Sequence, residues 1–150
     1  MRLSADDERV GPAPAPARGA RAVWPWVPVV AYMALIFALS SLSNPLPPLA
    51  EHLWDKGMHF VEYGVLGALL ALAFRASGMR GWRALVMVVV AASLYGVTDE
   101  LHQAFVLNRS SDIRDWLADT MGGALGASAA ALALRVHRSR ASIRPVQRRT

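Results

Sequence analysis

The sequence predicts an all-α protein, a four-helix transmembrane bundle with both termini in the cytoplasm. The first observation is composition, because 54% of the 150 residues are hydrophobic and only 18% are charged, less charge than a soluble domain of this size carries. The second is pattern, because the apolar residues form four long blocks instead of alternating with polar ones. The third is the placement of basic residues, which gather at the termini and between the blocks as in a membrane topology.

The elements follow in order along the chain. Residues 1–21 are polar and rich in proline and alanine, and they predict a disordered cytoplasmic tail. Apolar blocks at 22–42, about 57–74, about 84–106 and about 116–134 are each close to the roughly 20 residues that a helix needs to cross a bilayer. They define one transmembrane domain at 22–135, followed by a basic tail at 136–150. The first block could instead be a signal peptide, but its long apolar run and lack of an A-x-A site favour retention.

The basic residues predict the orientation. Thirteen of the sixteen lie in the N-terminal tail, in the loop between the second and third helices, and in the C-terminal segment that begins at Arg135. The other three, Lys56, Arg109 and Arg114, lie on the opposite side. The positive-inside rule then places loops 43–55 and 107–115 outside, in a multi-pass protein of the bacterial cytoplasmic (inner) membrane whose partner is the lipid bilayer. Because topology explains the pI near 10.7, no nucleic-acid partner is expected. The absence of cysteine excludes disulfides, thiolate nucleophiles and cysteine metal sites.

Polar residues lie on one face of each of the last three helices, near their outer ends. Helical spacing brings them to the same leaflet, where charge is costly unless it is paired, protonated or turned into the bundle. They form a candidate polar pocket: Asp55, His59, Glu62 and Tyr63 on the second helix, Asp99, Glu100, His102 and Gln103 on the third, Arg109 in the following loop, and Asp115 and Asp119 on the fourth.

Structural roles compete with a functional one for these groups. Asp55 would cap the second helix, and Ser111 or Asp112 the fourth. Lys56 and Arg114 would be interfacial anchors. Two histidines three residues from a carboxylate, His59 with Glu62 and His102 with Asp99, favour a shared site over a purely structural network.

Three segments, taken together, resemble a known family. They are "DKGMHFVEYGVLG" (55–67), "DELHQ" (99–103) and an arginine, Arg109, followed six residues on by Asp115 and then by a helix of small residues. These segments resemble the VanZ-like membrane proteins over roughly residues 25–135. The family often has Pro-Gly before the arginine where this chain has Leu107–Asn108, and many members carry asparagine where this chain has Asp119. The resemblance implies a cell-envelope protein and a link to teicoplanin-type glycopeptide resistance.

Three functions remain open at this point. The first is an outward-facing pocket that binds a polar headgroup or a lipid-linked cell-wall precursor, with Arg109 as the anion contact. The second is a membrane-embedded enzyme on a lipid-linked envelope substrate, using either a general base or a divalent metal as cofactor. The metal candidates are His59, Glu62, Asp99 and His102. The third, ion- or proton-coupled transport, is disfavoured because the polar groups do not cross the membrane.

Overall fold

The computed structural model describes residues 23–43 and 48–142, with side chains at 23–43 and 55–140. The described elements are a 3-10 turn η1 (Trp24–Trp26) and four helices, α2 (Val27–Ser40), α3 (Pro48–Ala76), α4 (Trp82–Gln103) and α5 (Ile113–Ser142). No strand occurs in these described residues. The predicted all-α, four-helix fold is therefore confirmed.

Three of the helices are long and apolar enough to cross a membrane: Asp55–Ala76 within α3, all of α4, and Ile113–Arg140 within α5. The apolar helix at the N-terminal end is shorter, at Trp24–Ser40. At about 1.5 Å per residue its 17 residues span roughly 26 Å, a little less than the roughly 30 Å hydrocarbon core.

Two helix bounds differ from the prediction. α3 begins at Pro48, well before Asp55, so Asp55 lies inside a helix and the expectation that it caps this helix is wrong. α5 continues to Ser142, past the predicted end of the domain at 135, so the first residues of the predicted basic tail are helical. The predicted tail at 1–21, and the rest of the basic tail at 143–150, lie outside the described residues.

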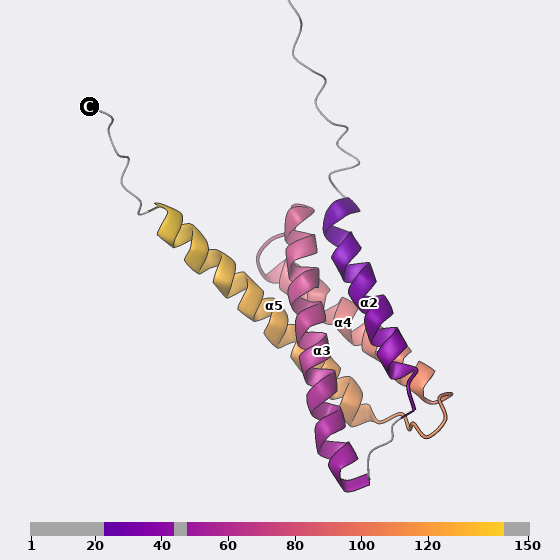
Figure 1. Cartoon of the computed structure of the whole chain (residues 1–150). Helices are drawn as coiled ribbons and strands as arrows, with labels where there is room; N and C mark the ends of the chain where they lie inside the picture. The colour runs from indigo at the N-terminus through magenta and orange to yellow at the C-terminus, as the bar shows by residue number, and fades with distance from the viewer. Residues whose placement is uncertain (1–22, 44–47, 143–150) are drawn as a thin grey trace, which may run out of the picture.

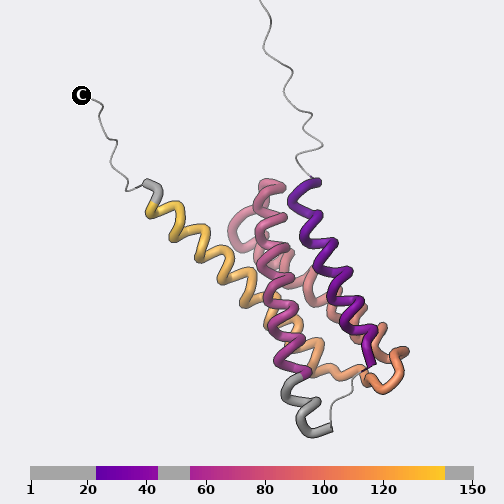
Figure 2. Tube along the Cα trace, viewed as in Figure 1, coloured from indigo at the N-terminus to yellow at the C-terminus, as the bar shows by residue number. Residues whose placement is uncertain are grey.

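The helices alternate in direction. The start of α2 and the end of α5 lie toward the same end of the bundle, and the α4–α5 loop lies at the opposite end (Figure 1). The C-terminal half of α5 diverges from α2 and α3 (Figures 1 and 2). In agreement, no described side chain after Ala127 is buried. The hydrophobic core lies where α3 packs against α2 and α4, with Ala127 contributed by α5.

Glycines allow α3 and α5 to approach closely. A methyl group added at Gly126 would overlap the backbone carbonyl of Gly64, and one added at Gly122 would overlap that of Phe60. Small residues four apart are the usual device for close packing of membrane helices. Gly122 and Gly126 thus allow α5 to pack closely on α3, and the polar faces of the two helices come within hydrogen-bonding distance.

Candidate functional site

The centre of the polar cluster is His59 on α3. Its Nδ1 lies 2.9 Å from Oδ1 of Asp119 on α5, and both side chains are almost fully buried, at 5% and 0% exposed. An ionised carboxylate can only accept, so Nδ1 is the donor of this hydrogen bond when Asp119 is ionised. Gly96 of α4 leaves the room that Asp119 needs, since a methyl group there would lie 2.8 Å from Asp119 Oδ2.

A second row of contacts joins this centre to the N-terminal helix. Gln103 lies with its Nε2 3.4 Å from His59 Nε2 and donates to Asp99 Oδ2 at 3.3 Å. Asp99 Oδ1 in turn accepts from the Ser40 hydroxyl of α2 at 2.5 Å. His59, Asp99 and Gln103 are all buried. The cluster therefore involves four helices, where the sequence predicted three.

Ion pairs surround the centre on its outer side. Lys56 Nζ bridges Asp112 Oδ2 at 3.0 Å and Asp115 Oδ1 at 2.8 Å. Arg109 Nη1 lies 3.0 Å from Asp55 Oδ1, and its Nε donates to the Leu42 carbonyl at 3.3 Å. Lys56 thus joins α3 to the start of α5, and Arg109 joins the α4–α5 loop to α3. Lys56 is therefore a member of the site and not only an interfacial anchor.

The loop after α4 positions these partners through two local features. Asn108 has φ of 61°, a left-handed conformation that asparagine tolerates better than most side chains. Asp112 precedes α5 and accepts from the Arg114 backbone N–H at 2.9 Å, which confirms the predicted cap. This bond, together with the bond from Lys56, holds the pKa of Asp112 below its usual value.

Glu100 of α4 is bound to the same loop. Its Oε2 accepts from the Asp112 backbone N–H at 2.7 Å, while its Oε1 is buried without a hydrogen-bond partner. Two other buried atoms in the described part of the chain lack a partner, namely Tyr63 Oη and Asp119 Oδ2. These atoms come from three helices, so the interior of the cluster has unused hydrogen-bonding and ligating capacity.

The structure brings most of the predicted residues together, but two lie apart from the centre. His102 bonds Ser41 of α2, with 2.9 Å between its Nε2 and the Ser41 hydroxyl, and stacks on Phe37 with ring centroids 4.2 Å apart. Glu62 is half-buried and forms no hydrogen bond or ion pair with the described residues. The sequence analysis did not predict Ser40 and Ser41 as site residues. Two serines at the outer end of an apolar helix, next to the predicted polar cluster, were the feature of the sequence that indicated them.

Two groups of side chains could hold a metal ion. One is His59 with Glu100 and Asp119, all buried, and the other is His59 with Asp55 and Asp115, with the ligand atoms of each group within 4.8 Å of one another. Of the four candidates named from the sequence, only His59 is in these groups. One imidazole and two carboxylates form a donor set suited to a divalent transition metal.

The cluster carries an excess of acidic groups. Seven described carboxylates lie at this end of the bundle, against three cations, Lys56, Arg109 and Arg114. A pocket of about 430 Å³ exists in the structure, but it lies at the opposite end, where α3 meets the α3–α4 loop. The polar groups are thus paired with one another rather than arranged around that cavity.

A helical membrane protein with a buried histidine–carboxylate centre at one end of its bundle is the class that this fold and site define. Within that class, the chain matches the VanZ/LLP1 family model over residues 18–134, more than three quarters of its length. It belongs to the VanZ/LLP1 family. Comparison with curated proteins and with solved structures found no match.

Proposed function

We propose that this protein is a multi-pass cell-envelope protein of the bacterial cytoplasmic membrane whose buried centre binds a divalent cation at the outer leaflet. His59, Glu100 and Asp119 would be the ligands. The observation that carries the proposal is that these three side chains meet from three helices while Glu100 Oε1 and Asp119 Oδ2 are buried without partners. Buried carboxylate oxygens without donors are costly, and a cation would relieve that cost.

Charge favours a cation over an anionic headgroup at this site. The cluster has more carboxylates than cations, and its two best anion contacts, Lys56 and Arg109, already pair with Asp112, Asp115 and Asp55. A phosphate or carboxylate group would have to displace those partners. An outward-facing pocket for a headgroup or cell-wall precursor is therefore the second candidate, favoured only by the half-buried position of Arg109 near the surface.

The chemistry that such a centre supports is acid/base or metal-assisted reaction on a lipid-linked envelope substrate, such as a cell-wall precursor. A bound divalent ion would supply Lewis acidity. Asp119 would offer its unpaired Oδ2 to the ion, while its Oδ1 keeps the contact that orients the His59 ring. A link to teicoplanin-type resistance would follow if that precursor is the glycopeptide's target.

Metal content tests the proposal. We expect the purified protein, dialysed against micromolar zinc or manganese, to hold about one equivalent, and His59→Ala to hold none. His102→Ala is the matched control, because it removes a histidine of the same end that lies outside both ligand groups, and it should keep the ion. A folded wild-type protein without metal under these conditions would contradict the proposal and leave the headgroup pocket as the better candidate.

Cysteine labelling tests the orientation. The chain has no cysteine, so a thiol reagent can label only the single cysteine that each variant introduces. Ser110→Cys, exposed in the α4–α5 loop, should react with a membrane-impermeant thiol reagent added to intact cells. Ala76→Cys, exposed at the end of α3, should react only after lysis. The reverse result would put the polar cluster on the cytoplasmic side.

A further inference from the structure

The pocket at the other end of the bundle has no role in the centre described above. It has a volume of about 430 Å³, in the range of small-molecule sites, and is lined by residues of α3, the α3–α4 loop, α4 and α5. Its lining residues on α5, from Ala127 to Arg135, belong to the part of the chain where α5 diverges from α3. Figure 1 shows that divergence.

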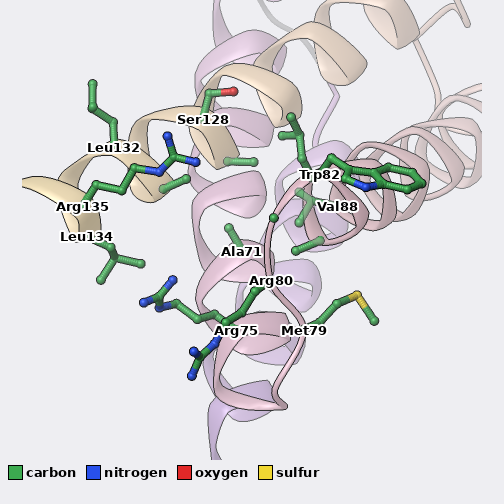
Figure 3. Close-up of a pocket in the computed structure, with 15 residues that line it drawn as sticks. Ala71, Arg75, Met79, Arg80, Trp82, Val88, Ser128, Leu132, Leu134 and Arg135 are labelled. Carbon is green, nitrogen blue, oxygen red and sulfur yellow. The ribbon is translucent and has the colours of Figure 1, made fainter. Parts of the chain in front are cut away.

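Three arginines converge on this pocket. Arg75 comes from the end of α3, Arg80 from the α3–α4 loop, and Arg135 from α5. Figure 3 shows their guanidinium groups on one side of the pocket and Trp82 on the other. The lining includes no Asp or Glu, and none of the three arginines forms an ion pair with any described residue. The positive-inside rule explains the sign of this charge but not its convergence from three elements on one cavity.

The rest of the pocket lining is mostly apolar, and part of it is exposed on the outside of the bundle. Ala71 and Val88 form the inner part, and Leu85 and Leu132 lie toward the surface, with Leu132 62% exposed. In a membrane-spanning chain an exposed apolar wall is in contact with acyl chains. An occupant of this pocket can therefore enter from the bilayer, with its charged part among the arginines and its apolar part along α4 and α5.

We propose that this pocket binds the phosphodiester headgroup of an anionic phospholipid, with the first part of its acyl chains along the apolar wall. Planar guanidinium groups match phosphate oxygens in two-point hydrogen bonds, and none of these three has a carboxylate partner among the described residues that would compete with an anion. Basic pockets between transmembrane helices are suited to anionic headgroups for this reason. A zwitterionic choline headgroup would place its own cation against the arginines and should bind poorly.

The test is calorimetric titration of the full chain in maltoside micelles. The probes are dioctanoyl phosphatidylglycerol, dioctanoyl phosphatidylcholine and inorganic phosphate. The variant Arg75→Gln/Arg80→Gln/Arg135→Gln removes the three lining cations. Its control, Arg140→Gln/Arg148→Gln/Arg149→Gln, removes the same charge from the segment that follows the lining residues of α5. We expect phosphatidylglycerol to bind the wild type, to lose about tenfold or more in affinity in the lining variant, and less than about threefold in the control.

Each other result overturns the assignment. Equal losses in the two triple variants would mean diffuse attraction to positive charge. Equal binding of phosphatidylcholine would mean an apolar crevice without headgroup recognition. Binding of inorganic phosphate as tight as that of the lipid would mean a soluble phosphate ligand. If the lining variant does not fold, Ala131→Trp keeps the charge and fills the cavity, and unchanged lipid affinity in that variant would exclude the pocket.

Discussion

Nδ1 of His59 lies 2.9 Å from Oδ1 of Asp119, and this contact joins α3 to α5 through two buried side chains. We expect Asp119→Ala to lower the free energy of unfolding by about 3 kcal/mol. This value is the upper end of the cost of leaving a buried polar group without a partner and the lower end of the cost of breaking a buried ion pair. Asp119→Asn keeps an acceptor at the same place and should cost clearly less. Thermal unfolding in detergent, followed by circular dichroism, measures the stability of both variants. Equal losses of stability in the two variants would mean that the hydrogen bond to His59 does not stabilise the fold.

The glycine contact between α3 and α5 predicts opposite effects for two similar substitutions. Gly126→Ala puts a methyl group into the backbone carbonyl of Gly64, so the helices must separate and the protein should lose roughly 1–3 kcal/mol of stability. Gly57→Ala is the control, because no atom lies within 4 Å of its added methyl group. It should be neutral or stabilise α3 by about 0.5–1 kcal/mol. Comparable losses at the two positions, in the same unfolding assay, would contradict the close packing.

The sequence predicted the helices because apolar length is a local property. It misjudged the start of α3, because residues 48–54 are less apolar than the block that follows and add little to a hydropathy pattern, yet they continue the same helix. The end of α5 was misjudged for a similar reason. The basic segment after Arg135 is polar, but nothing in it breaks a helix before Ser142.

The sequence predicted which helix faces carry the site residues, but not which of their side chains contact one another. Helical spacing placed His59, Asp99 and Asp119 toward one end, which the structure shows. Which atoms meet depends on helix rotation and separation, set here by contacts such as Gly64 with Gly126, and spacing along one helix does not encode them. His102 illustrates the limit, since it shares a helix end with Gln103 but contacts α2 and not His59.

The ion pair between Arg109 and Asp55 predicts energetic coupling between the α4–α5 loop and α3. A double-mutant cycle with Arg109→Ala and Asp55→Ala should give a coupling energy of about 1 kcal/mol, modest because both side chains keep some exposure. Arg114→Ala is the matched control. Its side chain forms no ion pair with the described residues, so its effect should add to that of Asp55→Ala. A coupling energy near zero would mean that Asp55 does not hold Arg109, and it would favour an anion-binding role for Arg109.

Asp112 predicts a dependence of stability on pH, because it both caps α5 and pairs with Lys56. Asp112→Ala loses both interactions and should cost about 1 kcal/mol or somewhat more, whereas Asp112→Asn keeps the cap and loses only the charge. The folded-state pKa of Asp112 is held below its ordinary value of 3.8.

The sign of the pH effect follows from that lowered pKa. A carboxyl group whose pKa is lower in the folded state contributes stability that is complete above its unfolded pKa and is lost as pH falls through its folded pKa. The difference in unfolding temperature between wild type and Asp112→Asn should therefore be constant from pH 7 down to about pH 4 and shrink below it. Because Asp115 also holds Lys56, Asp115→Asn at neutral pH should enlarge the effect of removing the Asp112 charge. If this difference in unfolding temperature instead grows below pH 4, the folded protein does not stabilise the ionised form of Asp112.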